Sequence, residues 1–408
     1  AMDNRPEPGG YYLTEAEKAL VAQVTGAFRK VCVVVDAGNI MDLSWVEAYP
    51  IGALLYAFQG GMESGNALMD VLYGDAQPGG RLTDTVPRHY EDAPSYGHFG
   101  GRDFNEYRED IYVGYRYYET FAQDKVLYPF GFGLSYTTFR VESAAEVWQT
   151  NWDLRIQVTN TGSRPGRQVV QVYVEAPQGK LGKAARVLAD YWKTPELAPG
   201  QSAAVSLWID LKSLASFDDS GVTGHPFAYV LEAGTYRLYV GTDVRSAGLA
   251  GRLFLEEQTL TAQLESQCSP TQDFPRLHPK EEGGRLVPGF EPVPRAESRR
   301  KDQVLAHLPE PIPFTGDLGI SFRDVCKGTK GLDDFIAQLT PEELNALCKG
   351  EGPMDSPLGT KGNAGMLGGT TRSLRDKGVP TLTTTDGPSG IRVCCYTALL
   401  PCGTALAS

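Results

Sequence analysis

The chain has 408 residues, of which 41% are hydrophobic and 10% aromatic. That is enough apolar material for sizeable cores, and the length predicts roughly two to four domains. Charged residues make up only 22%, which excludes a chain that is disordered throughout. The best apolar run starts at Val31 and stops at Asp36, far short of the ~20 residues that a membrane helix needs.

The formal net charge of −12 excludes further classes of partner. An acidic chain without a basic stripe is a poor binder of nucleic acid and of anionic membranes, whereas neutral substrates remain open. The seven cysteines show neither C-x-x-C nor Cys/His spacing, so the sequence predicts reduced thiols and no metal site. Reduced thiols, together with a first segment that lacks a signal-peptide pattern, predict a cytoplasmic protein.

Residues 11–90 have the alternating pattern of an α/β domain. Thr14 and Glu17 form a capping-box pattern at the start of a helix. Short apolar runs at residues 31–35 and 51–58 predict strands, and helical spacing resumes through residues 67–72. Strands and helices in this arrangement predict a parallel sheet covered on both faces.

From about Phe139 the pattern changes to short alternating strands separated by turn signals. These runs lie at residues 154–158, 169–174, 203–209, 228–231 and 236–240. About 120 residues of this kind predict an antiparallel β-sandwich. Residues 262–300 are rich in Pro, Glu, Arg and Gly and lack periodicity, which predicts a linker or an extended strap.

A second α/β stretch follows the strap. Residues 331–346 are predicted to be helical, with an N-terminal signal that begins at Thr340. Residues 381–385 predict a strand that stops abruptly at Asp386. No internal repeat is present.

Asp386 is the main candidate for chemistry, because α/β folds place ligands at the carboxyl ends of their strands. Gly387, Pro388 and Gly390 predict a rigid turn beside it, and Arg392 follows six residues after Asp386. A carboxylate next to a guanidinium can clamp vicinal hydroxyls, because the acid accepts hydrogen bonds and the arginine donates them. The alternative is a turn carboxylate that satisfies its own backbone amides, and the pattern leaves both open.

Other candidates are less specific. Residues 106–119 mix carboxylates with tyrosines, which can stack on sugar rings or pack an α/β domain against its neighbour, and we favour packing. Residues 60–65 do not fit G-x-G-x-x-G and no Walker lysine follows, which argues against a phosphate site. Ser64 lacks the G-x-S-x-G frame of a hydrolase nucleophile, and the five histidines show no i,i+4 pairing.

Taken together and in this order, several motifs resemble glycoside hydrolase family 3, the β-glucosidase family. In the α/β part they are Trp45-Val46, Gly60-Gly61-Met62-Glu63, Asp70-Val71-Leu72-Tyr73-Gly74, Pro78-Gly79-Gly80-Arg81-Leu82, Tyr112-Val113-Gly114-Tyr115-Arg116-Tyr117 and Tyr128-Pro129-Phe130-Gly131-Phe132-Gly133. In the β part they are Val158-Thr159-Asn160-Thr161-Gly162, Val169-Val170-Gln171-Val172-Tyr173 and Leu197-Ala198-Pro199-Gly200, and near the end Thr385-Asp386-Gly387-Pro388-Ser389-Gly390-Ile391-Arg392.

The resemblance implies a multidomain fold of α/β and β parts. Residues 1–138 are expected to form the C-terminal part of an α/β (flavodoxin-like) sandwich, and residues 139–260 a fibronectin-III-like β-sandwich. Residues 261–310 are the linker or strap, and residues 311–408 are expected to open a (β/α)8 barrel. Most members run from barrel to α/β sandwich to fibronectin-like domain, so this order resembles the circularly permuted branch of the family.

The resemblance also implies a retaining enzyme that removes terminal, non-reducing β-D-glucosyl residues from β-glucosides or short β-glucan oligosaccharides, without metal or organic cofactor. Retention requires two carboxyl groups ~5–5.5 Å apart. The family's acid/base Glu lies just before the segment that starts at Asn4, and its nucleophilic Asp lies on a later barrel strand. No residue of this chain is therefore assigned a catalytic role. The matching Asp386 and Arg392 are expected to bind hydroxyls of the sugar in subsite −1.

Both ends of the chain look cut, and an incomplete barrel would leave strands unpaired. We therefore expect a second chain or a further segment to complete the barrel, with a homo-oligomer as a further option. Three alternatives stay open: a non-catalytic carbohydrate-binding or scaffold fragment; the same fold with xylosidase, arabinosidase or N-acetylglucosaminidase specificity; and a flavodoxin-like nucleotide-binding module, which would need a phosphate loop.

Overall fold

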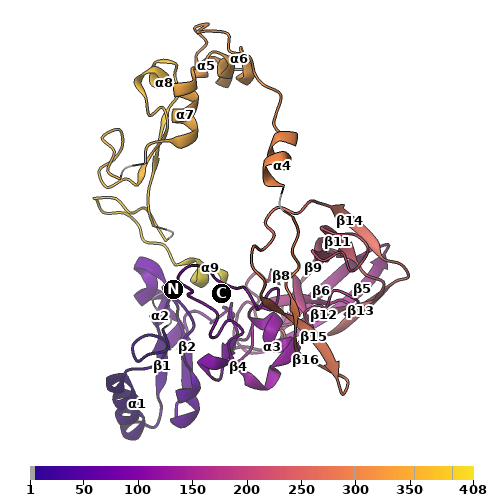
Figure 1. Cartoon of the computed structure of the whole chain (residues 1–408). Coiled ribbons are helices and arrows are strands. Elements are labelled where there is room, and N and C mark those ends of the chain that lie inside the picture. Colours follow the sequence, from indigo (N-terminus) through magenta and orange to yellow (C-terminus); the bar gives the residue numbers. More distant parts are fainter. Residues whose placement is uncertain (1–4, 298, 353, 388) are drawn as a thin grey trace. The chain divides into compact units, whose positions relative to one another are not determined.

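The structure is a computed structural model that describes residues 5–297, 299–352, 354–387 and 389–408 (Figure 1). These residues form two compact units. Unit 1 takes in residues 5–58, 66–297 and 407–408, and unit 2 takes in residues 59–65 and 299–406 except 353 and 388. Residues 1–4, next to which the acid/base loop is expected, lie outside the described residues.

The α/β part of unit 1 begins as the sequence predicts. Its elements are α1 (Glu15–Ala27), β1 (Cys32–Val35), β2 (Ala53–Tyr56), α2 (Ser64–Tyr73), β3 (Val86–Pro87), α3 (Tyr115–Phe121) and β4 (Val126–Tyr128). The capping box is confirmed, because the Thr14 hydroxyl accepts from the Glu17 amide and the Glu17 carboxylate accepts from the Thr14 amide. Strands β1 and β2 pair in parallel, also as predicted, whereas β3 and β4 pair antiparallel.

The expectation of a sheet covered on both faces is only partly met. In β1 the side chain of Val35 is buried, but Cys32 is exposed. Because the parallel sheet has two strands among the described residues, each strand is an edge and keeps one open side. A small core lies beneath it, formed by Leu13, Val35, Leu43, Trp45 and Val86.

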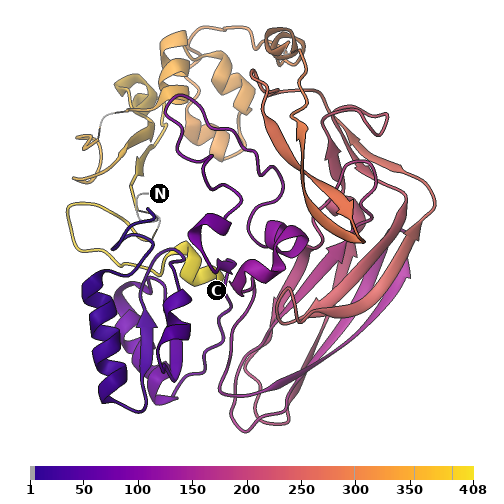
Figure 2. The same ribbon diagram turned by 60° about the horizontal axis from the view of Figure 1, so that its bottom comes forward.

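The β-sandwich is the largest core of unit 1 (Figure 2, magenta strands). One sheet is ordered β5-β6-β9 and the other β13-β12-β7-β8, with a smaller sheet β10-β11-β14. The bounds are β5 (Phe139–Trp148), β6 (Asn151–Asn160), β7 (Val169–Glu175), β8 (Val187–Lys193), β9 (Ser202–Asp210), β10 (Ser216–Asp218), β11 (Ala228–Leu231), β12 (Gly234–Gly241), β13 (Gly248–Leu255) and β14 (Thr259–Gln263). All five predicted runs are strands, and every pair is antiparallel.

The alternation in β6 explains why this sandwich is stable. Trp152, Leu154, Ile156 and Val158 are all at most 1% exposed, and they face the buried side chains of the opposite sheet. A period of two places every second side chain on the same face, so a single strand contributes four residues to the core. At ~25 cal/mol per Å2, a row of this kind is a major source of the stability of the sandwich.

The predicted linker or strap contains regular structure. Strands β15 (Pro275–Glu282) and β16 (Arg285–Pro292) form a two-stranded antiparallel ribbon, shown in orange in Figure 1. Proline usually argues against a strand, yet Pro279 pairs with Pro288 and Pro275 with Pro292. A ribbon of two strands has only edges, so a missing N–H can face outward without breaking a ladder.

Unit 2 is mostly short helices around a small core. Its elements are α4 (Arg300–Ala306), α5 (Phe322–Cys326), α6 (Leu332–Ala337), α7 (Pro341–Lys349), β17 (Gly365–Gly368), α8 (Arg372–Asp376), β18 (Thr381–Thr384) and α9 (Gly403–Ala407), the last continuing into unit 1. The core consists of Ile320, Phe335, Leu339, Leu374 and Val379. A short 3-10 helix of unit 2 lies at Gly61–Glu63, and those of unit 1 lie at Ser44–Ala48, Tyr90–Asp92, Gln123–Lys125 and Leu211–Leu214.

The prediction of one helix over residues 331–346 is wrong, because residues 338–340 are not helical and separate α6 from α7. The buried Gln338 accepts hydrogen bonds from the backbone amides of Leu318 (3.1 Å) and Ile320 (3.0 Å). Thr340 then caps α7 with Glu343 in a new capping box. The distant backbone therefore determines where α6 ends.

The strand after which Asp386 follows is confirmed as β18, but it pairs antiparallel with β17. This departs from the parallel ladder of a (β/α)8 barrel. Residues 369–380 hold only the five-residue helix α8, and a parallel crossover usually needs a longer connection. The chain therefore returns beside β17 in the opposite direction.

Three findings concern membrane-spanning helices, disulfides and metal sites. No helix of the described residues is long and apolar enough to cross a bilayer. All seven cysteines have free thiols. Within the described part of the chain, no three His, Cys, Asp or Glu side chains are grouped to hold a metal ion.

Candidate functional site

The structure brings Asp386 and Arg392 together on one turn of unit 2. They form an isolated antiparallel bridge, in which the Arg392 amide donates to the Asp386 carbonyl at 2.9 Å. The turn depends on glycines, since Gly387 has a φ of 110° and a Cβ there would collide with the Gly390 carbonyl. Pro388, which the sequence placed in this turn, lies outside the described residues.

The two side chains form an ion pair that faces solvent. Nη1 of Arg392 donates to Oδ2 of Asp386 at 3.0 Å, while Oδ1 accepts from the Gly387 amide at 2.8 Å. Both sequence interpretations are therefore present at once, the turn carboxylate and the acid–guanidinium pair. The side chains are 55% and 79% exposed, and each retains hydrogen-bonding capacity: oxygen lone pairs on Asp386 and N–H groups on Arg392. The arrangement can accept from one hydroxyl and donate to its neighbour.

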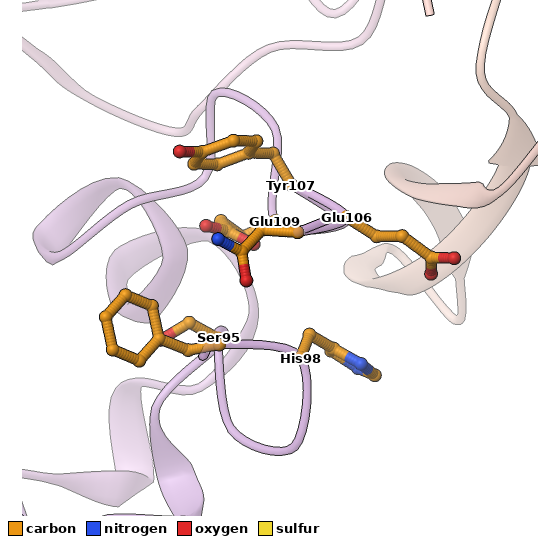
Figure 3. Close-up of a pocket in the computed structure, with 7 residues that line it drawn as sticks. Ser95, His98, Glu106, Tyr107 and Glu109 are labelled. Carbon is orange, nitrogen blue, oxygen red and sulfur yellow. The ribbon is translucent and has the colours of Figure 1, made fainter. Parts of the chain in front are cut away.

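Unit 1 carries a second candidate, a pocket in the long loop 93–114 between the 3-10 helix Tyr90–Asp92 and α3 (Figure 3). It is lined by Ser95, His98, Phe99, Asn105, Glu106, Tyr107 and Glu109. Figure 3 shows Ser95 and His98 on one limb of the loop and Tyr107 and Glu109 on the other. Sequence analysis pointed to the carboxylates of residues 106–110 but missed Ser95, His98, Phe99 and Asn105, for which the only signal was glycine-rich turns.

The tyrosines that follow this loop are structural. Tyr112 and Tyr118 are buried, and Tyr115 stacks on Phe130 with ring centroids 4.6 Å apart. The Tyr115 hydroxyl also accepts from the Leu188 amide at 2.8 Å, which ties α3 to strand β8 of the sandwich. Packing, the interpretation that the sequence favoured, is thus confirmed for these rings.

Glu119 on α3 is the most deeply buried carboxylate near the loop. Its Oε1 accepts from Nε of Arg245 at 2.9 Å. Burial raises the pKa of Glu119, and the Arg245 guanidinium opposes that rise. Because the carboxylate is already paired inside the protein, we assign it a structural role.

Known proteins align with the whole chain, and two family models match parts of it. The glycosyl hydrolase family 3 C-terminal domain matches residues 7–136, and a fibronectin type III-like domain matches residues 168–244. The chain is 41% identical to a "Beta-glucosidase" of Ruminococcus albus, over 100% of the chain and 43% of that protein. It is 37% identical to "Beta-glucosidase A" of Butyrivibrio fibrisolvens, over 98% of the chain and 52% of that protein.

A solved structure agrees along the full chain. The crystal structure of a β-glucosidase from Paenibacillus barengoltzii matches with a TM-score of 0.94 at 42% identity, over 100% of this chain and 46% of the other. The chain belongs to glycoside hydrolase family 3. It spans about half the length of the relatives that it matches.

The two candidate sites fall in different parts of this family 3 chain. The pocket residues 95–109 lie inside the match to the family's C-terminal domain. Asp386 and Arg392 lie beyond both matched domains, in the segment that the full-length alignments still cover.

Proposed function

We propose that this protein is a β-glucosidase, or part of one, which removes terminal non-reducing β-D-glucosyl residues with retention of configuration. The observation that carries the proposal is the Asp386–Arg392 pair, held at 3.0 Å on the turn after β18 in a family 3 chain. Relatives named β-glucosidase support it, since two of them align over at least 98% of this chain. The substrates would be β-glucosides and short β-glucan oligosaccharides.

In this proposal Asp386 and Arg392 bind the sugar in subsite −1. The free lone pairs of Asp386 accept from one hydroxyl, and the free N–H groups of Arg392 donate to the next. Contacts of this kind accelerate hydrolysis only if they are stronger in the transition state than in the bound substrate. The nucleophile and the acid/base, which retention requires, are proposed to come from outside these 408 residues.

We also propose the domain organisation that the resemblance implies, with bounds 1–138, 139–260, 261–310 and 311–408 and a permuted order. The two family matches support the first two domains, in an order that unpermuted members share, so the permuted order rests on a barrel segment after them. The full-chain likeness to the Paenibacillus enzyme supports an opening barrel in residues 311–408. The antiparallel β17–β18 pair would then be an irregular feature at the start of a barrel whose other strands are parallel.

A partner segment that completes the barrel is part of the proposal. Ile391, Leu399 and Leu400 are each at least 55% exposed, in the same stretch as the Asp386–Arg392 pair. Clustered exposed apolar residues mark surfaces that another segment covers. A cytoplasmic location is proposed as well, in keeping with the free thiols.

The test establishes which polypeptides the protein contains and which glycoside it hydrolyses fastest. Intact mass and a denaturing gel establish whether a second polypeptide accompanies the chain, and aryl β-glucoside, β-xyloside and N-acetyl-β-glucosaminide are then assayed side by side. We expect the glucoside to be hydrolysed fastest and NMR to show the β-anomer of glucose as the first product. Faster hydrolysis of the β-xyloside or of the N-acetyl-β-glucosaminide would refute the glucosidase specificity in favour of that one. A single chain without turnover would exclude catalysis by this chain alone and leave a truncated or binding-only protein.

A further inference from the structure

The loop that forms the pocket of unit 1 is unusually rich in exposed aromatic rings. Residues 93–114 contain neither helix nor strand, and loops longer than ~12–15 residues in compact domains usually carry function. Within it Tyr96 is 50% exposed, Phe99 75%, Phe104 55% and Tyr107 71%. Aromatic rings left in water over one short stretch mark a surface that a ligand covers.

The polar groups of the pocket are arranged around these rings. Oδ1 of Asn105 accepts from the Gly101 amide at 2.7 Å, which leaves its N–H2 group available. Among the described residues, the Glu109 carboxylate, the His98 ring and the Tyr107 hydroxyl have no side-chain hydrogen bond, and all three line the pocket. The pocket therefore offers both acceptors and donors beside an aromatic face.

The aromatic rings and the polar groups together indicate which class of ligand the pocket can bind. The Glu109 carboxylate in the lining disfavours anions such as phosphates, whereas Glu106 is already paired with Arg108. The free polar groups disfavour a purely apolar ligand, because they would be buried without partners. A pyranose ring fits both demands, since its C–H face packs on an aromatic ring while its hydroxyls bond to carboxylates and amides.

The limb of the loop that carries Tyr107 and Glu109 is held in place by the proline-rich ribbon. The Arg108 carbonyl accepts from the Leu277 amide at 2.7 Å. Next along the ribbon, Arg276 pairs with Asp110 at 3.4 Å, with Asp219 at 2.6 Å and with Glu291 at 2.8 Å. One guanidinium thus ties the loop, the sandwich and the ribbon together, and it fixes the limb that carries Tyr107 and Glu109. A pre-organised limb lowers the entropy cost of binding.

We infer that this pocket of unit 1 binds a glucosyl ring of a β-linked oligosaccharide. Tyr107 and Phe99 supply the aromatic face, and Glu109 and Asn105 bond to the hydroxyls. The inference rests on the proposed function for the choice of glucose as the sugar. The ligand chemistry itself rests on the pocket.

The test is calorimetric titration of the Asp386→Ala form of the whole protein with cellotriose, because the active protein is proposed to hydrolyse this sugar. We expect Phe99→Ala and Tyr107→Ala each to weaken binding about five- to tenfold, as the loss of an aromatic contact does. Glu109→Gln keeps the shape of the side chain and should weaken binding in the same direction. The matched control is Phe254→Ala, because this ring is also exposed (66%) but lies on strand β13 of the sandwich, and it should leave affinity unchanged.

The outcomes separate the pocket from the proposed function. Because the pocket variants are made in the Asp386→Ala background, the expected loss of affinity depends neither on hydrolysis nor on the proposed sugar contacts of Asp386. Cellotriose affinity that stays within about twofold of the Asp386→Ala parent in both aromatic variants overturns the pocket inference, whatever the hydrolysis. Pocket-dependent binding supports the inference, and it overturns the proposed function alone if the protein with Asp386 and the completing segment both present hydrolyses no glycoside.

Discussion

Replacing Asp386 by Ala should reduce catalysis far more than stability. In the structure the carboxylate makes one backbone bond, to the Gly387 amide, and one exposed ion pair, to Arg392. A net hydrogen bond contributes about 1 kcal/mol and an exposed ion pair about 0–1 kcal/mol, so the variant should lose only about 1–2 kcal/mol of unfolding free energy.

The effect on catalysis follows from the hydroxyls that Asp386 is proposed to bind. Hydrogen bonds to a charged group contribute about 1.5–3 kcal/mol each, so two of them contribute about 3–6 kcal/mol. At about 1.36 kcal/mol per factor of ten, kcat/KM on an aryl β-glucoside should fall about 150- to 25,000-fold. The assay is steady-state hydrolysis by the active preparation, paired with urea unfolding of the same sample.

Asp317→Ala is the matched control within unit 2. Asp317 also accepts from a turn amide, that of Gly319 at 2.8 Å, and it also pairs with a cation, Lys377 at 3.1 Å. Its loss should lower the melting temperature to a similar small extent and leave kcat/KM within about twofold. If Asp386→Ala behaves like this control, with activity within a few-fold of wild type, the pair only stabilises the turn and the sugar-binding role is refuted.

Three predictions concern the sandwich. Trp152→Ala should cost about 3–5 kcal/mol in chemical denaturation, because the ring is 0% exposed in the main core, and a loss below about 1 kcal/mol would contradict that packing. Burial alone would raise the pKa of Asp218, but hydrogen bonds led by those from Thr223 outweigh it and hold the pKa below the usual 3.8. The stability from this carboxylate is therefore present above about pH 4 and lost as the pH falls through its lowered pKa, so Asp218→Asn should flatten the acid limb of a pH–melting profile. Glu232→Gln should cost about 3–5 kcal/mol because it strands the buried ammonium of Lys183, and a Lys183→Met, Glu232→Leu double variant should recover much of the loss.

Local interactions account for what the sequence predicted well. The capping boxes at Thr14 and at Thr340 join residues three positions apart, so the pattern alone identifies the helix starts. The alternation in β6 reflects a strict period of two. Asp386 and Arg392 likewise belong to one short turn, and their proximity could be inferred from six residues of sequence.

Distant partners explain the errors. The break between α6 and α7 depends on Gln338, whose side chain bonds to the backbone 18 residues earlier. The antiparallel direction of β18 depends on which strand lies beside it, and no local pattern encodes that. The ribbon 275–292 has a sequence typical of a linker, and it is ordered because its two strands pair with each other and Arg276 binds three carboxylates.

Short motifs suffice to infer the family, the order of the α/β and β parts, and the pair Asp386 and Arg392, because each rests on a few neighbouring residues. No such motif predicts that Tyr112 and Tyr118 are buried while Phe99 and Tyr107 face solvent, although all four lie within one short stretch of chain. The reason is physical. A side chain's exposure depends on which distant elements pack over it, and those contacts exist only once the ribbon and the sandwich have folded beside the loop.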